Sequence, residues 1–304
     1  MKILVKLLGI GLLVSFALGC NQNKPQNLAE LETAIQAKFA SVEGDYALAF
    51  LLLGDEEKEI LINEHKEFHA ASTMKTPVMI ELYQQAYDGK VNLDDSILVK
   101  NSFYSIVDSS EYEMDLNEDS GERMYQYIGE KLPVRELMYD MIVYSSNLAT
   151  NILIELVDAK KVTQTMRQLG AEDIQVLRGV EDIKAFEQGL SNTTTAMDLL
   201  KIYEGLAKER VVSQVASKDM IEILKQQHFK DVIPAKLPKD VEVAHKTGWI
   251  TGVRHDSGIV YLPEGQKYVL VILSKNIQDD KAALKMMTEV SRMIYEFVSK
   301  SSKK

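Results

Sequence analysis

The sequence is poor in cysteine, in basic charge and in metal-binding patterns, and each shortage excludes a class of protein. Cys20 is the only cysteine among 304 residues, so no disulfide can form within the chain. Acidic residues outnumber basic ones, 45 to 35, and no run of basic side chains occurs, which argues against nucleic-acid binding and against electrostatic attachment to anionic lipid. The five histidines show no spacing typical of a metal site, so we expect neither a metal nor an organic cofactor.

Long apolar runs are also scarce, and an extended one at the N-terminus predicts an export signal over residues 1–20. Lys2 and Lys6 give this segment a positively charged start. Residues 7–19 then form an apolar stretch that is too short to span a bilayer as a helix. We therefore expect an exported protein, located in the periplasm or at the cell surface.

The end of this segment resembles the lipidation site of a bacterial lipoprotein. The small residue Gly19 precedes Cys20, and a lone cysteine is rare in exported chains, although residues 17–18 depart from the usual pattern. The resemblance implies a membrane anchor of acyl chains on Cys20, with residues 21–27 as a tether. The alternative is an ordinary secretory signal in which Cys20 is part of the apolar stretch.

Three short motifs carry most of the chemical information: Ser72-x-x-Lys75, Ser145-Ser146-Asn147 and Lys246-Thr247-Gly248. Together they offer an activated hydroxyl, a second hydroxyl that can pass a proton onward, and a cation for an anionic substrate. Each motif alone is weak, because S-x-x-K recurs at 301–304 and S-x-N at 274–276. Their order, separation and apolar surroundings distinguish the three from these repeats.

The first motif predicts a nucleophile and its base on one helix. Residues three apart share a helix face, so the Ser72 hydroxyl and the Lys75 ammonium can meet. Desolvation near other cations would leave Lys75 neutral part of the time and able to accept a proton. The free N–H groups at the helix start would face the oxygen of an acyl intermediate. The alternative is a plain helix-capping Ser72 beside a solvated Lys75.

The other two motifs are expected at a helix junction and at the end of a strand. Ser145 and Asn147 lie between two apolar helices, where Ser146 is expected to cap the second helix. Gly248 lets a substrate backbone approach the strand, while Lys246 and Thr247 offer donors to a carboxylate. A solvated lysine at a strand end is the alternative for Lys246.

S-x-x-K, S-D-N and K-T-G occur together in class A β-lactamases and penicillin-binding proteins, and the chain resembles that class A serine hydrolase family of the penicillin-recognising superfamily. Residues 192–195 and 233–238 are also similar to family stretches, so the resemblance spans roughly 28–300. Within the family the chain looks closest to a divergent lipoprotein branch with the strings RGVED…TTT and HKTG…RHD. Ser146 departs from the pattern, which usually has Asp there.

The resemblance implies roles for individual residues. Ser72 would attack the substrate carbonyl, and Ser145 would pass a proton to the leaving nitrogen. Asn147 would bind the substrate amide and Lys75. The N–H groups of Ser72 and Trp249 would form the oxyanion hole. The Trp249 ring either stacks on the ligand or fills a gap in the core, and Arg254 is a candidate second anchor for a carboxylate.

A glutamate that releases the acyl group is harder to place. Class A enzymes carry this Glu shortly after an Arg in their Ω-loop. Here Glu181 follows Arg178 one residue later than usual, and Glu187 is a second candidate. A solvated loop carboxylate is the alternative for both. If neither reaches the water, the protein would be acylated and stall, as a penicillin-binding protein does.

The order of expected elements predicts an α/β (α+β) fold. Strands are expected over 46–53, 59–63, 241–245, 256–262 and 268–274, and helices over 28–41, 72–87, 134–144, 147–157, 160–169, 195–207, 216–227 and 279–299. An antiparallel sheet flanked by helices would be built from about 28–75 and 237–300. A helical lobe would cover about 76–236, with its acidic stretch 93–129 as a solvated insertion. The active site would lie in the cleft between them.

The sequence therefore indicates one catalytic domain over 28–300, acting as a serine β-lactamase through an acyl-enzyme on Ser72. One alternative is a D,D-peptidase that acts on peptidoglycan stem peptides with the same acylation machinery. The other is a lipoprotein that binds wall peptides without catalysis. We expect a monomer whose partner is a β-lactam or a stem peptide.

Overall fold

A five-stranded antiparallel sheet, in the order β2-β1-β11-β10-β9, organises the computed structural model, which describes residues 25–54 and 57–301. Its strands are β1 (Asp45–Leu53), β2 (Lys58–Ile62), β9 (Glu242–Ile250), β10 (Val253–Tyr261) and β11 (Lys267–Lys275). Strands from the two ends of the chain pair directly, β1 with β11, as expected. The export signal and Cys20 lie outside the described residues.

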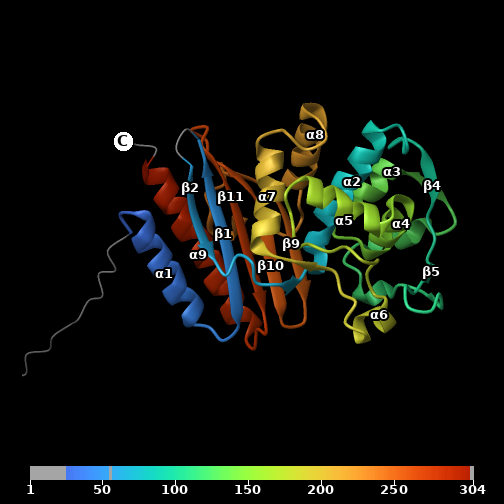
Figure 1. Cartoon of the computed structure of the whole chain (residues 1–304), viewed down its shortest axis with the longest axis horizontal. Helices are drawn as coiled ribbons and strands as arrows, with labels where there is room; N and C mark the ends of the chain where they lie inside the picture. Colours follow the sequence, from blue (N-terminus) through green and yellow to red (C-terminus); the bar gives the residue numbers. More distant parts are fainter. Residues whose placement is uncertain (1–24, 55–56, 302–304) are drawn as a thin grey trace, which may run out of the picture.

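Helices cover both faces of this sheet, because its strands are apolar on both sides. On one face, α1 (Leu28–Ala40) and α9 (Asp280–Ser301) pack on each other and enclose a core with alternate residues of β1 and β11. On the other face, α7 (Ala196–Ala207) packs against β1, β10 and β11 (Figure 1). A capping box of Thr195 and Asp198 starts α7. The predicted α+β fold is confirmed.

The remaining helices gather beyond β9 (Figure 1). They are α2 (Lys75–Tyr87), α3 (Val134–Val143), α4 (Asn147–Val157), α5 (Ala159–Gln168), α6 (Ile183–Glu187) and α8 (Gln214–Lys225). Short strands and 3-10 helices link them: β3 (Phe68–His69), η1 (Ala71–Met74), β4 (Ser96–Leu98), β5 (Phe103–Tyr104), β6 (Glu111–Tyr112), η2 (Leu116–Glu118), η3 (Glu122–Tyr127), β7 (Lys131–Pro133), β8 (Thr193–Thr194) and η4 (Pro234–Lys236). No helix of the described residues is long and apolar enough to cross a membrane.

Two local expectations were wrong. Lys246 lies inside β9 and not at a strand end, because β9 and β10 stay paired as far as Ile250 and Val253, where Gly252 turns the chain at φ 74°. Ser72 lies in η1 and not in the following helix, which begins at Lys75. The lysine strand therefore extends alongside the turn that carries Ser72.

The expectation of a solvated insertion over 93–129 was also wrong in part. Phe103, Met114 and Met124 belong to the main hydrophobic core. The carboxylate of Asp119 is buried as well, at 5% exposure. The acidic composition of the segment suggested solvent, but its apolar residues anchor it against the helices.

Candidate active site

The three motifs meet at one cavity of about 300 Å³ between the sheet and the helices beyond β9. Each motif contributes to its lining, which consists of Ser72, Ser120, Ser145, Phe229, Asp231, Val232, Thr247, Gly248, Trp249, Arg254 and His255. The sequence did not indicate Ser120, Phe229, Asp231 or Val232, since they come from stretches without a motif. Residues as far apart in sequence as Ser72 and Trp249 therefore line one concave, polar site.

Ser72 is held in a tight turn against β9. The preceding Ala71 has a left-handed backbone at φ 44°, a strained conformation typical of functional turns. A Cβ on Gly248 would lie 3.1 Å from the backbone nitrogen of Ser72 and 3.2 Å from the Cβ of Ala71. The lack of a side chain at Gly248 therefore lets the strand approach the turn this closely.

His255 fixes the same turn from β10, and sequence reasoning did not give it this role. Its Nε2 donates to the carbonyl of His69 (2.8 Å), and its Nδ1 accepts from the backbone N–H of Ser274 (3.1 Å). The N–H of Ala71 in turn donates to Nδ1 of His69 (3.0 Å). Burial lowers the pKa of His255 to about 4, so the ring is neutral and holds the His69 carbonyl and the Ser274 N–H in place by hydrogen bonds.

The Ser145 hydroxyl lies between two buried lysines. Nζ of Lys75 is 3.2 Å from Oγ of Ser145, and Nζ of Lys246 is 3.1 Å from the same oxygen. Lys75 also donates to the carbonyl of Ser145 (2.7 Å), and Lys246 donates to the carbonyl of Thr247 (3.0 Å). Ser145 has a left-handed backbone at φ 60°, which turns its side chain between α3 and α4.

Burial makes both lysines easier to deprotonate. It lowers the pKa of Lys75 from 10.5 to about 8, although the carboxylates of Asp119 and Glu181 oppose this change. Burial also lowers the pKa of Lys246 well below its ordinary value, the charge of Lys75 lowers it further, and Asp256 opposes both. The site therefore holds a lysine that can exist as a free amine near neutral pH.

Asn147 connects this cluster to the candidate glutamate. Its Oδ1 accepts from Nζ of Lys75 (2.8 Å), and its Nδ2 donates to Oε1 of Glu181 (2.9 Å). Glu181 has a left-handed backbone at φ 62°, and its Oε2 accepts from the N–H of Asp115 (3.3 Å). Glu187 is exposed at the end of α6. Of the two candidates, the structure brings Glu181 to the site.

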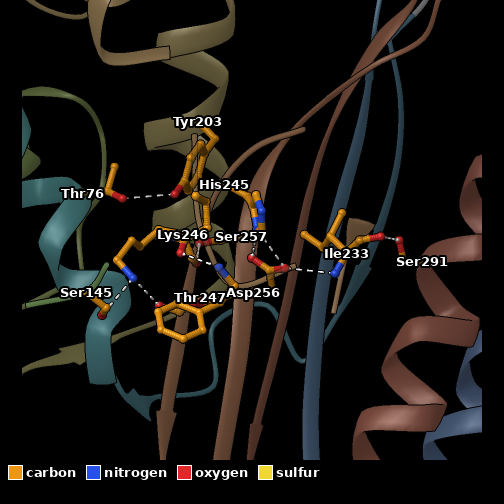
Figure 2. Close-up of polar contacts among 12 residues, drawn as sticks. Thr76, Ser145, Tyr203, Ile233, His245, Lys246, Thr247, Asp256, Ser257 and Ser291 are labelled. Carbon is orange, nitrogen blue, oxygen red and sulfur yellow. Dashed lines mark hydrogen bonds and ion pairs between the residues drawn. The ribbon is translucent and has the colours of Figure 1, made fainter. Parts of the chain in front are cut away.

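Behind Lys246, a buried histidine and a carboxylate form a pair on the opposite side of β9 (Figure 2). Nδ1 of His245 lies 2.8 Å from Asp256, whose other oxygen accepts from the N–H of Ile233 (2.9 Å). Ser291 on α9 donates to the carbonyl of Ile233, which ties this pair to the outer helix. The carboxylate of Asp256, which raises the pKa of Lys246, is therefore tied to α9 through Ile233.

Trp249 lies at the rim of the cavity. Its side chain is 62% exposed, so the alternative of a ring that fills the core was wrong. The Arg254 guanidinium lies 6.0 Å from the ring centre and donates to Asp231 (2.7 Å) and to Asp280 (2.7 and 3.0 Å). Because two carboxylates already bind Arg254, it is less available as the second anchor for a substrate carboxylate that the sequence suggested.

Ser72 and Ser145 line one cavity, the buried amine of Lys75 contacts Ser145, and the carboxylate of Glu181 is joined to Lys75 through Asn147. A set of groups of this kind is suited to acyl transfer through a serine ester. The family model described as the beta-lactamase enzyme family matches residues 30–298. The chain therefore belongs to the beta-lactamase enzyme family.

Particular relatives are distant. The chain is similar to the extended-spectrum beta-lactamase PER-1 of Pseudomonas aeruginosa, with 23% identity over 80% of this chain and 79% of the relative. The beta-lactamase from Sphaerobacter thermophilus has a TM-score of 0.77 at 24% identity over 90% of this chain and 97% of that one. PBP-A has the same TM-score and coverage at 25% identity, and a mutant of it has been solved as an acyl-enzyme complex with penicillin G.

We predict that His255 makes the fold acid-sensitive. The unfolded chain binds a proton near the ordinary pKa of 6.5, whereas the native ring resists protonation down to about 4. The stability contributed by the neutral ring is complete above pH 6.5 and lost as the pH falls through 4. This difference corresponds to about 3 kcal/mol.

The test is urea denaturation at fixed pH values for the wild type and His255→Gln. Between pH 6.5 and 4, the wild type's free energy of unfolding should fall by about 3 kcal/mol more than that of the variant. The exposed His228→Gln is the matched control and should behave as the wild type. Equal falls in the wild type and His255→Gln would contradict the role of this ring.

Proposed function

We propose that this protein is a serine β-lactamase that opens β-lactam rings through a Ser72 acyl-enzyme, and so confers resistance to these antibiotics. The observation that carries the proposal is the Ser145 hydroxyl between Lys75 and Lys246, at 3.2 and 3.1 Å, beside Ser72 in one cavity. This arrangement places a base and a proton carrier in contact, at the cavity that the Ser72 nucleophile also lines. Among the described residues, no cluster of His, Cys, Asp and Glu could hold a metal ion.

In the acylation step, Oγ of Ser72 attacks the lactam carbonyl carbon and gives its proton to the neutral amine of Lys75. With a pKa of about 8, roughly a tenth of Lys75 is neutral at pH 7. The amide C–N bond then breaks, and the Ser145 hydroxyl passes its proton to the leaving nitrogen while it regains one from Lys75. The N–H groups of Ser72 and Trp249 would bind the oxyanion, and Lys246 and Thr247 the substrate carboxylate.

In the deacylation step, Glu181 would take a proton from water as that water attacks the ester carbonyl. The bond between the acyl carbon and Oγ of Ser72 then breaks, and the proton passes to Oγ, which restores the Ser72 hydroxyl and the Glu181 carboxylate. Asn147 supports this assignment because one amide contacts both Glu181 and Lys75. Glu181 therefore belongs to the same hydrogen-bonded cluster as the acylation base, even though it follows Arg178 one residue late. General-base assistance of this kind contributes about 10²–10⁴-fold to a rate.

A D,D-peptidase that acts on peptidoglycan stem peptides is the second candidate. The likeness to PBP-A, at 25% identity, favours it over an unrelated activity, since the acylation groups would be shared. The two functions differ in the acyl-enzyme's fate. A lactamase releases the acyl group rapidly, whereas a peptidase acylated by a β-lactam stalls.

We also propose export with a lipid anchor on Cys20, which the motif at residues 19–20 supports. Cells supplied with a labelled fatty acid should incorporate it into the wild-type protein and not into Cys20→Ser. Labelling of both proteins, or of neither, would contradict the anchor. In that case the apolar segment 7–19 would still support export, but without a lipid anchor.

The test of the proposed activity combines turnover of a chromogenic cephalosporin with the mass of the intact protein. We expect steady colour formation by the wild type and a transient adduct, and neither with Ser72→Ala. Glu181→Gln should still be acylated but should release product about 10²-fold more slowly, so that the adduct accumulates. The matched control is Glu187→Gln, which should turn over as the wild type.

The alternatives give different results. A stoichiometric adduct on the wild type, unaffected by Glu181→Gln, would identify a peptidase and contradict the lactamase. Absence of any Ser72 adduct in the wild type would contradict both enzymes and leave a protein that binds wall peptides without catalysis.

A further inference from the structure

We propose that Asp119 is a positioning residue for acylation, whose carboxylate holds the turn of Ser145 and Asn147 against Lys75. The inference rests on the proposed function, because it concerns the rate at which Ser72 is acylated. Asp119 lies in the acidic segment 93–129, far from the three motifs in sequence. Its contacts, its burial and its charge support the assignment.

The carboxylate of Asp119 binds the start of α4 with both oxygens. Oδ1 accepts from the backbone N–H of Asn147 (2.9 Å) and of Gly121 (2.8 Å). Oδ2 accepts from the N–H of Asn147 (2.9 Å) and of Leu148 (2.8 Å). A buried carboxylate at a helix N-terminus is well placed, since the N–H groups there have no partner within the helix and the helix dipole favours negative charge.

Ser146 alone could not accept hydrogen bonds from all the free N–H groups at the start of α4. Its hydroxyl is the cap of α4 and accepts from the N–H of Ala149 (3.2 Å), which leaves the N–H groups of Asn147 and Leu148 to another acceptor. The motif usually has an aspartate at this position, whereas this chain has a serine. Asp119 supplies a carboxylate to the turn from 28 residues before Asn147.

The segment around Asp119 also touches the turn directly. A Cβ on Gly121 would lie 2.3 Å from the Cβ of Ser146, so the two backbones pack as closely as a glycine allows. Ser120, between Asp119 and Gly121, lines the cavity. A displacement of this segment would therefore move the Ser145–Asn147 turn and one wall of the site together.

The charge of Asp119 affects the pKa of Lys75, the acylation base. Its carboxylate raises the pKa of Lys75 against the larger effect of burial, as Glu181 also does, while Lys246 is the cation that shares Ser145 with Lys75. Burial raises the pKa of Tyr125 near Asp119, so this phenol stays neutral. Removal of the charge at 119 should consequently lower the pKa of Lys75, which a purely structural cap would not do.

Two variants separate position from charge. Asp119→Asn keeps the shape of the side chain but removes its charge. It also replaces one acceptor oxygen by an NH₂ group, which cannot accept from the backbone N–H groups of the turn. Gly121→Ala keeps the charge and forces the segment away from Ser146. The matched control is Asp198→Asn, which removes another buried helix-capping carboxylate, at the start of α7.

The measurement is the second-order rate of Ser72 acylation by a fluorescent penicillin as a function of pH, with urea unfolding of each variant. For Asp119→Asn we expect a maximal rate about 10–100-fold lower, because small misplacements of reacting groups cost this much. The rise of the rate with pH, which follows loss of the Lys75 proton, should also move to lower pH. Gly121→Ala should lose rate without this movement, and Asp198→Asn should lose stability and keep its rate.

Several results would overturn the proposal. Acylation of Asp119→Asn within about twofold of the wild type, with an unchanged pH profile, would do so. So would a loss in Asp198→Asn as large as that in Asp119→Asn. If Asp119→Asn does not fold, Gly121→Ala decides, and a wild-type rate in that variant contradicts the inference. No adduct on the wild type would instead refute the proposed function, on which this role depends.

Discussion

The structure depends on the burial of two lysine side chains around one hydroxyl. Lys75 and Lys246 both contact Oγ of Ser145, and neither side chain is exposed to solvent. Two ammonium groups in such a place would each cost several kcal/mol without compensation. The site reduces this cost in two ways, because the pKa of each lysine is lowered and carboxylates surround the pair. The lowered pKa of Lys75 is also what the proposed acylation needs, since a lysine that loses its proton readily can act as a base at neutral pH.

The fold supplies these compensating charges from different layers. Asp256 comes from β10 and is held by His245 and the N–H of Ile233 (Figure 2). Glu181 comes from the loop before α6 and reaches Lys75 through Asn147. Asp119 comes from a segment whose apolar residues are part of the main core. Stability and reactivity are therefore linked, because each carboxylate that lowers the cost of burial also sets the proton affinity of a lysine.

Much of this architecture could be predicted from local patterns. The apolar runs 46–53 and 268–274 indicated strands, and their pairing followed from the expected sheet. The helix expected over 195–207 was found as α7, which Thr195 and Asp198 cap. The shared face of Ser72 and Lys75 stays a prediction, since Ser72 lies in η1, before the helix that begins at Lys75. Each of these signals lies within a short stretch of sequence, so it can be recognised without the structure.

The rest depends on contacts between distant segments. The acidic composition of 93–129 predicted a solvated insertion. Nothing near Asp119 in sequence indicates that its carboxylate will accept hydrogen bonds from the N–H groups at the start of α4. The structural role of His255 could not be predicted from its neighbours in sequence, since its partners His69 and Ser274 lie on other strands. The extension of β9 beyond Lys246 is set by pairing with β10 and not by its own residues. Propensity cannot reveal such long-range pairing.

The most direct test of this account is the proton affinity of Lys75 in the folded protein. Selective ¹³C labelling of lysine side chains and an NMR titration of the ε-carbon would measure it, with the signal assigned through Lys75→Arg. The account predicts a midpoint near 8, well below the ordinary lysine value of 10.5. A midpoint at the ordinary value would show that Lys75 is solvated and charged at neutral pH, and would contradict the arrangement described for this site.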